Sequence, residues 1–228
     1  MKSWNLISGA LVIGTVLATG ARSAQAAMES QVIDYGSASS PVAGGDTVNL
    51  SFNKFDPSLG TLTDIILTLS SVDTVQSVVF DPNGGGNGYT AASVSGGMET
   101  VNALNGLSTS TASLAAGPFA GVTTGANTIA GSSTQTLSAS THVLPADFSS
   151  YTGGAGTFDV SVVTGTATSS GSYLGNELFF GWNANSYGSV EIDYDFAAVP
   201  EPGTWFAGLS VLGVCGVSLL RRKSAVGC

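Results

Sequence analysis

VNLSFNKFDPSLGTLTDIILTLS, residues 48–70, contains two runs in which apolar and polar residues alternate. The apolar members are Val48, Leu50 and Phe52 in the first run and Ile65, Leu67 and Leu69 in the second. Because successive side chains of a β-strand point to opposite faces, a period of two predicts strands with one face in a core and the other in water. The residues between the runs, Asp56 to Gly60, have turn chemistry, so we expect them to join the first strand pair.

The same alternation recurs further along the chain, at Phe158, Val160 and Val162. No internal stretch has apolar residues at helical spacing with start and stop signals. Short strands punctuated by Gly and Asn predict an all-β fold, an antiparallel β-sandwich that is jelly-roll-like or immunoglobulin-like. Residues 105–141 are rich in Ser, Thr, Ala and Gly, and we interpret them as an insertion or as weak strands with lower order than their neighbours.

The N-terminus has the pattern of a secretory signal peptide over residues 1–26. Lys2 precedes an apolar segment from Leu6 to Ala18, and Ala24 and Ala26 are small residues at the positions that a signal peptidase reads. We expect cleavage after Ala26, which leaves residues 27–198 as one extracellular domain. An uncleaved N-terminal anchor is the alternative.

The C-terminus combines a proline motif, an apolar run and a basic end. Val199, Pro200, Glu201 and Pro202 open the motif, residues 199–203, and the two prolines break the preceding strand and expose Glu201. Residues 204–220 carry no charge and just reach the length of a transmembrane helix. The basic stop consists of Arg221, Arg222 and Lys223, which predicts that the body faces outward.

This three-part tail, residues 199–223, resembles the PEP-CTERM sorting signal of Gram-negative bacteria that make exopolysaccharide. The resemblance implies that an exosortase, a membrane-embedded enzyme, recognises Pro200 to Pro202 and cleaves near them. The chain would then be anchored in the inner membrane in transit and delivered to the cell surface or extracellular matrix. A plain single-pass anchor with a proline-containing stem is the alternative.

Three fragments of the body resemble choice-of-anchor E domains, which are extracellular and β-rich. They are residues 48–70, residues 148–158, which read FSSYTGGAGTF, and the closing segment 188–196. The resemblance extends from about Gln31 to Phe196 and is loose in its middle third. It implies a fold and a cell-envelope location, and it implies no catalytic residue, cofactor or ligand.

Charge and cysteine content exclude several kinds of function for the body of the chain. Residues 27–199 contain 14 Asp and Glu and one Lys, Lys54, so their formal net charge is −13. Such a body repels nucleic acid and anionic membrane surfaces. Cys215 and Cys228 both lie in or after the apolar run, so the body has no disulfide, no thiol catalyst and no Cys-ligated zinc.

Two acidic stretches are candidate calcium sites. The loop from Asp81 to Gly88 places Asp81, Asn83 and Asn87 among glycines, as calcium loops do, although a hairpin loop explains the same composition. Glu191, Asp193 and Asp195 share one face of a strand, and this pattern fits a solvated sheet edge, a cation site or, remotely, acid catalysis.

His142 is the only histidine, and no Gly-x-Ser-x-Gly motif accompanies it, so we interpret it as a loop or strand residue rather than a catalytic base. A group of aromatic residues precedes the closing strand: Tyr173, Phe179, Phe180, Trp182 and Tyr187. The simple interpretation is core. A sugar-binding platform is the alternative, and it would need exposed rings beside Asn183 or Asn185.

These observations predict an exported protein of structural or adhesive type, not an enzyme and without a cofactor, whose processing partners are signal peptidase and an exosortase. A carbohydrate-binding module of the exopolysaccharide matrix, with or without calcium, is the second hypothesis. A secreted hydrolase is the third, because one histidine and scattered acids make no convincing acid/base set.

Overall fold

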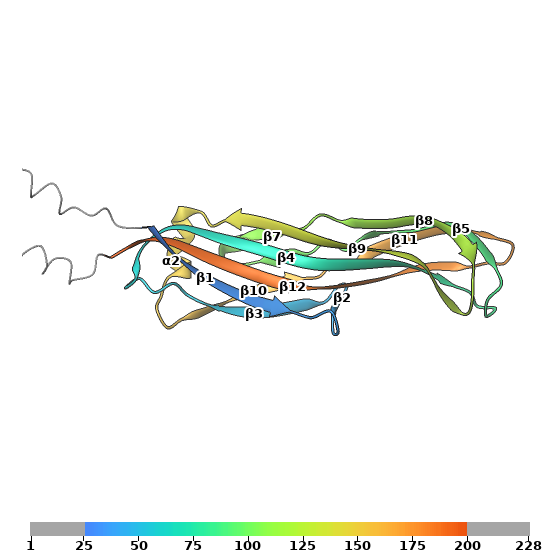
Figure 1. Cartoon of the computed structure of the whole chain (residues 1–228), viewed down its shortest axis with the longest axis horizontal. Coiled ribbons are helices and arrows are strands. Elements are labelled where there is room, and N and C mark those ends of the chain that lie inside the picture. Colours follow the sequence, from blue (N-terminus) through green and yellow to red (C-terminus); the bar gives the residue numbers. More distant parts are fainter. Residues whose placement is uncertain (1–25, 200–228) are drawn as a thin grey trace, which may run out of the picture. The chain divides into compact units, whose positions relative to one another are not determined.

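The computed structural model describes residues 26–199, and these residues form mainly antiparallel β-sheets (Figure 1). The chain divides into two compact units. The larger unit comprises residues 28–57 and 62–195, and the described part of the smaller unit is limited to short segments at the ends of three strands.

The strands follow the alternation that the sequence predicts. Their bounds are β1 (Ala26–Tyr35), β2 (Val42–Ala43), β3 (Thr47–Asn53), β4 (Gly60–Phe80), β5 (Gly88–Gly96), β6 (Thr100–Asn102), β7 (Ser108–Ser110), β8 (Leu114–Val122), β9 (Asn127–His142), β10 (Thr157–Val163), β11 (Ala167–Leu174) and β12 (Phe179–Ala198). Helical turns within the described residues are short: η1 (Leu104–Gly106), η2 (Pro145–Asp147) and α2 (Phe148–Tyr151).

The strands form three sheets. The first has the order β1-β12-β4-β9, with β2 also paired to β12; the second has the order β3-β10-β6-β7; the third has the order β11-β5-β8. The longest ladder joins β4 to β9 from Ile66 opposite His142 to Phe80 opposite Asn127, with one bulge after Ser77. Strands β4 and β12 therefore lie inside the first sheet, and β1 and β9 form its edges.

Apolar side chains pack between the first sheet and the two smaller sheets. Toward the second sheet, the Tyr194 ring of β12 lies 5.7 Å from the ring of Phe55, and its hydroxyl donates to the carbonyl of Asn53. Toward the third sheet, Val75 of β4 packs with Val94 of β5 in one buried cluster. Burial of each such side chain contributes about 1.5–3 kcal/mol, which suits a body without disulfides.

The predicted inward residues of the first strands are buried, except that Val48 at the start of β3 is half-buried. Leu50 and Phe52 are buried in β3, and Ile65, Leu67 and Leu69 are buried in β4, as are Phe158, Val160 and Val162 in β10. The turn at residues 56–60 also exists, but our expectation that it joins a strand pair is wrong. Strand β3 pairs with β10, whereas β4 pairs with β9, so the turn connects two different sheets.

Residues 105–141 form strands, as the interpretation as weak strands predicts. They contain the end of η1, all of β7 and β8, and most of β9. The ladder between β9 and β4 explains why a segment with few large side chains forms a strand. Backbone hydrogen bonds to the apolar β4 hold it in place, although its own composition is weakly apolar.

In the smaller unit, the amide of Val199 donates to the carbonyl of Leu59 at 3.1 Å. The predicted signal segment up to residue 25 and the tail from Pro200 onward lie outside the described residues. The predicted cleavage after Ala26 would fall at the first residue of β1. No helix within residues 26–199 is long and apolar enough to cross a bilayer.

Candidate functional site

A cluster of polar side chains is buried where β1, β4, β12 and the loop before β6 meet. Tyr35 ends β1, Ser71 and Asp73 lie within β4, Ser186 lies within β12, and Glu99 precedes β6. The carboxyl-bearing residues are almost fully enclosed, with 2% of Asp73 and 1% of Glu99 exposed. Acidic residues are seldom fully buried without a partner, so this cluster is the most unusual chemical feature of the described residues.

Hydrogen bonds fix one oxygen of each carboxyl group. The Tyr35 hydroxyl donates to Oε2 of Glu99, and the Ser71 hydroxyl donates to Oδ2 of Asp73 at 3.0 Å. The Glu99 backbone is clamped by Thr111, because the Glu99 amide donates to Oγ1 of Thr111 at 3.0 Å and the Thr111 amide donates to the Glu99 carbonyl at 2.9 Å. The loop therefore holds Glu99 in a defined position although it belongs to no strand.

The other oxygens of the two carboxyl groups lack donors. Oδ1 of Asp73 and Oε1 of Glu99 are buried and have no hydrogen-bond partner. Both residues line a cavity of about 10 Å³, together with Thr164, Asn185, Ser186 and the backbones of Gly44, Gly97 and Gly165. A volume of this size accommodates one water molecule or one small ion.

Burial also controls the electrostatics of the cluster. Loss of solvation raises the pKa of Asp73, and the hydrogen bond from Ser71 opposes that shift. Burial likewise raises the pKa of Glu99, and the nearby charge of Asp73 raises it further. The Tyr35 pKa is raised by burial and then by Glu99, so its hydroxyl stays protonated and remains a donor. The cluster thus disfavours two simultaneous negative charges unless a positive group joins it.

The Asp81 loop is satisfied by protein donors. Oδ1 of Asp81 accepts from the Asn83 amide at 2.9 Å, and Oδ2 accepts from Nδ2 of Asn87 at 2.8 Å and from the Thr123 hydroxyl at 2.6 Å. These bonds, led by that of Thr123, lower the pKa of Asp81. The structure therefore brings Asp81, Asn83 and Asn87 together as the sequence predicts, with the aspartate buried in a hydrogen-bonded loop.

The three carboxylates of β12 do not lie at a sheet edge. Glu191, Asp193 and Asp195 alternate with the buried Ile192 and Tyr194, as predicted, and are half-buried on the other face. Because β12 lies between β1 and β4, the interpretation as a solvated edge is wrong. The Ser30 hydroxyl donates to Oε1 of Glu191 at 2.8 Å, and Oδ1 of Asp193 has no donor.

Among the described residues, no three side chains of His, Cys, Asp or Glu come close enough to hold a metal between them. Calcium also accepts hydroxyl, amide and backbone oxygens beside carboxylates.

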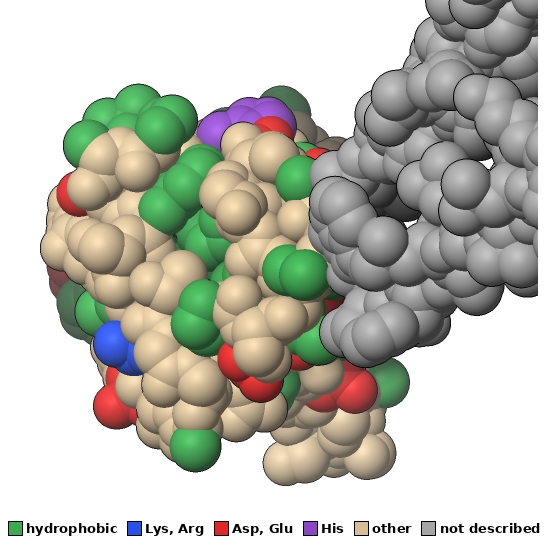
Figure 2. All heavy atoms as spheres, turned by 90° about the vertical axis from the view of Figure 1, so that its left-hand side faces the viewer, with side chains coloured by type: hydrophobic (Ala, Val, Ile, Leu, Met, Phe, Trp, Pro, Cys, Tyr) green, Lys and Arg blue, Asp and Glu red, His purple; other side chains and the backbone are tan. Residues whose placement is uncertain are grey.

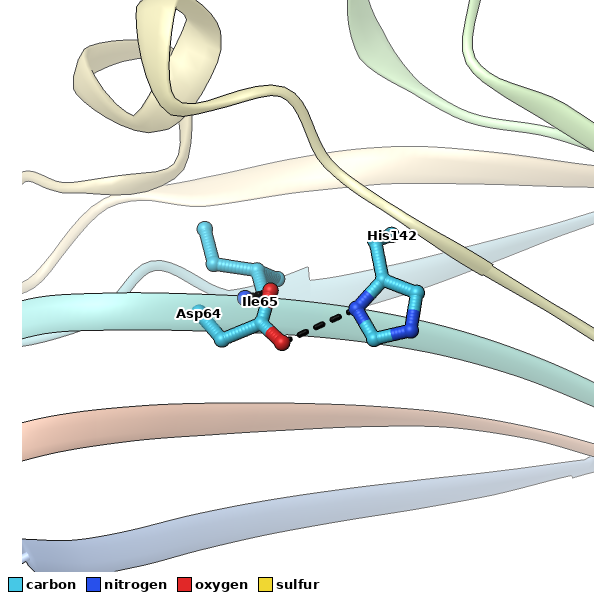
Figure 3. A network of polar contacts seen from close by, with 3 residues as sticks. All are labelled: Asp64, Ile65 and His142. Atoms are coloured by element: carbon cyan, nitrogen blue, oxygen red, sulfur yellow. Dashed lines mark hydrogen bonds and ion pairs between the residues drawn. The ribbon is translucent and has the colours of Figure 1, made fainter.

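His142 is the last residue of β9 and lies beside Asp64 of β4 (Figure 3). Nδ1 of His142 is 2.9 Å from Oδ2 of Asp64, and the Ile65 amide donates to the other oxygen of that carboxylate at 2.8 Å. The histidine side chain is 64% exposed. No hydroxyl among residues 26–199 hydrogen-bonds the ring, so the pair lacks the nucleophile of a serine triad.

The aromatic group is more exposed than a core would be. Phe179 is 54% exposed, Tyr173 is 48% exposed and Trp182 is 36% exposed, whereas Phe180 and Tyr187 are partly buried. The interpretation of these residues as core is therefore wrong for three of the five. The Phe179 ring lies 6.1 Å from the ring of Phe80, which is also exposed, and Nδ2 of Asn183 is 3.4 Å from Oε1 of Gln76.

The sequence contained a signal for Asp73 that the interpretation above did not use. The odd-numbered residues of β4 are buried from Ile65 onward, and the same parity continues through Ser71, Asp73 and Ser77 to Val79. Extension of the alternation past Leu69 predicts a carboxylate that points into the core. Glu99 had no such signal, because it lies in a loop outside the period-two pattern.

No family model and no curated protein matches the chain. Among solved structures, the chain is similar to a structure of the infectious bursal disease virus Gt strain at 14% identity, with 77% of this chain and 43% of that chain covered and a TM-score of 0.15. A structure of the Gx strain shows 10% identity, covers 90% of this chain and 50% of that chain, and has a TM-score of 0.12. The chain thus spans half or less of each.

Proposed function

We propose that this chain is an exported structural or adhesive protein of the cell surface or extracellular matrix, and that its β-sandwich body is delivered through an exosortase-dependent tail. The observation that carries the proposal for the body is the ladder between β4 and β9, which ties a Ser/Thr-rich strand to an apolar one. Cross-strand hydroxyl contacts add to it, such as Thr74 with Thr134 at 2.9 Å. A body that is stabilised by backbone hydrogen bonds and not by disulfides keeps its fold whatever the redox state of its compartment.

The surface of the body supports a role in which it stays soluble and does not associate nonspecifically. Figure 2 shows one face, on which uncharged polar side chains and backbone predominate and acidic and apolar side chains are scattered. The acidic excess of residues 27–199 repels other copies and other polyanions. In this proposal the tail supplies address and attachment, and the body supplies a stable acidic module.

The sorting proposal is tested by fractionation of a strain that lacks the exosortase. We expect the unprocessed chain to accumulate in the inner membrane, and we expect the same outcome for a Pro200→Ala/Pro202→Ala variant in the parent strain. Mass spectrometry of the released protein should place its new C-terminus near Glu201. A Ser169→Ala variant, altered in β11 of the body, should be exported normally. Unchanged export and an intact tail in the exosortase-deficient strain would refute the sorting proposal.

A second candidate function, carbohydrate binding, is favoured by the exposed rings of Phe179, Tyr173 and Trp182. Aromatic rings stack on the apolar faces of sugars, and neighbouring amides supply hydrogen bonds. Glycan-array binding by the wild type that is lost in Trp182→Ala, with an unchanged melting temperature, would support this candidate. Tyr187→Phe, which keeps its partly buried ring, is the control. No binding to exopolysaccharide by the wild type would refute it.

A further inference from the structure

Asp73 and Glu99 present two carboxyl groups to one small cavity, and no protein cation balances them. In the described part of the chain, the basic side chains are Lys54 and His142. The Lys54 stem lies near Gly153 and Gly156, and His142 pairs with Asp64. Neither lines the cavity. The two acids therefore have hydroxyl donors and no counter-charge.

The hydrogen-bond donors around the cavity reach only one oxygen of each carboxyl group. The Tyr35 hydroxyl donates to Oε2 of Glu99 and the Ser71 hydroxyl donates to Oδ2 of Asp73, so a hydrogen bond holds one oxygen of each carboxyl group. The remaining oxygens, Oε1 and Oδ1, are buried and without a donor. A buried polar atom without a partner destabilises the folded state, and a charged one does so more strongly. A single positive species between the two oxygens would remove this cost for both.

We propose that the cavity between Asp73 and Glu99 is a binding site for one calcium ion, with Oδ1 of Asp73 and Oε1 of Glu99 as its anionic ligands. The polar side chains that line the cavity offer carboxylate, hydroxyl and amide oxygens and no thiol or imidazole, which favours a hard cation over zinc or copper. Two carboxylates balance a charge of +2, and the cavity of about 10 Å³ holds one ion and not a hydrated cluster. Magnesium retains several waters and needs more room, so calcium fits better.

Ser186 would supply a neutral oxygen ligand to the same calcium ion. It lines the same cavity, and its hydroxyl oxygen lies 3.5 Å from the hydroxyl oxygen of Tyr35, which contacts Glu99. Calcium would then join β4, β12 and the loop before β6, which are far apart in sequence. This site differs from the Asp81 loop and the β12 carboxylates that the sequence predicts, and it does not depend on the proposed export or sugar binding.

The test uses the purified full chain in detergent at pH 7.5, stripped with EDTA and then titrated with calcium. We expect saturable binding of one ion by calorimetry, and a rise in Tm of about 3–6 °C at free calcium tenfold above Kd. Terbium emission excited through tyrosine gives a second readout, because Tyr35 contacts Glu99; calcium should displace it. Asp73→Asn and Glu99→Gln should each weaken calcium binding at least tenfold and abolish the Tm shift.

The control Asp159→Asn removes an equal charge from an exposed position of β10 and should keep the calcium response of the wild type. Asp81→Asn and Asp193→Asn test the other carboxylates and should also keep it. If the wild type shows no Tm shift and no terbium signal, the two acids share a proton or enclose a water, and the proposal is wrong. A calcium response that survives in Asp73→Asn and Glu99→Gln but disappears in Asp81→Asn or Asp193→Asn overturns it equally.

Discussion

The hydroxyl of Tyr35, at the end of β1, donates a hydrogen bond to Oε2 of Glu99, which lies 64 residues further along the chain in the loop before β6. Both residues are buried, so this bond links two distant segments inside the protein where water does not compete. It is also the contact that orients the free oxygen of Glu99 toward the cavity between Asp73 and Glu99.

Tyr35→Phe removes the donor and leaves the Glu99 carboxyl group with an additional unpaired oxygen. We expect the free energy of unfolding in EDTA to fall by about 1–3 kcal/mol, the cost of an unsatisfied buried polar group. Urea denaturation followed by circular dichroism measures it. Tyr173→Phe removes a hydroxyl from an exposed ring and should change stability by less than about 0.5 kcal/mol. Equal stability of the two variants would show that the buried bond contributes nothing.

The hydrogen bonds to Asp81 predict a loss of stability in acid. Thr123 and its neighbours hold the pKa of Asp81 below its ordinary value of 3.8, so the unfolded chain binds this proton more readily than the folded chain does. The contribution is therefore complete above about pH 4 and is lost as the pH falls through the lower folded-state pKa.

Asp81→Asn should consequently be less stable than the wild type at neutral pH, and the difference should shrink toward about pH 3. Urea denaturation at a series of pH values measures the difference. Asn83→Ala changes the same loop without a titratable group, so its stability difference from the wild type should not vary with pH. A constant difference for Asp81→Asn would contradict the assignment.

The sequence predicts the strands of this protein better than it predicts their partners. Alternation around Leu50 and Leu67 defines two strands and their buried faces, because a period of two is a local property. It does not determine that β3 pairs with β10, since that choice depends on contacts about a hundred residues apart. Because strand pairing cannot be read from a local pattern, the alternation at Glu191 and its neighbours predicted a solvated sheet edge. Whether β12 is flanked on both sides is a property of the sheet.

Only part of the candidate site could be predicted from the sequence. Asp73 continues the buried parity of β4, so its inward orientation could be predicted from the sequence alone. The approach of Glu99 to Asp73 could not, because a loop brings it there and the Thr111 clamp fixes it. The exposure of Phe179 was hidden for a related reason, since an aromatic residue in a strand has the same local pattern inside and outside a core.

The contact between His142 and Asp64 predicts a small energetic effect. Both side chains reach solvent, with 64% and 35% exposure, and an ion pair in contact with water contributes about 0–1 kcal/mol. A double-mutant cycle of His142→Gln and Asp64→Asn should give a coupling energy within that range. A coupling well above about 1 kcal/mol would indicate a network that a surface pair does not explain.

The wall of the cavity between Asp73 and Glu99 predicts a position where a single methyl group is not tolerated. A Cβ atom on Gly165 would lie 2.0 Å from the carbonyl oxygen of Met98, which is backbone and has no freedom to rotate away. We expect Gly165→Ala to lower the free energy of unfolding by about 1–3 kcal/mol, because the two loops that contain residues 98 and 165 must separate to admit the methyl group. Differential scanning calorimetry should show a fall in Tm of several degrees, and calcium binding should weaken because Gly165 lines the same cavity.

Gly125→Ala is the matched control, since a Cβ atom there meets nothing within 4 Å, and its Tm should stay within about 2 °C of the wild type. If Gly165→Ala melts at the wild-type temperature, the packing of residue 165 against residue 98 is looser than the structure indicates, and the enclosure of the cavity would have to be reconsidered.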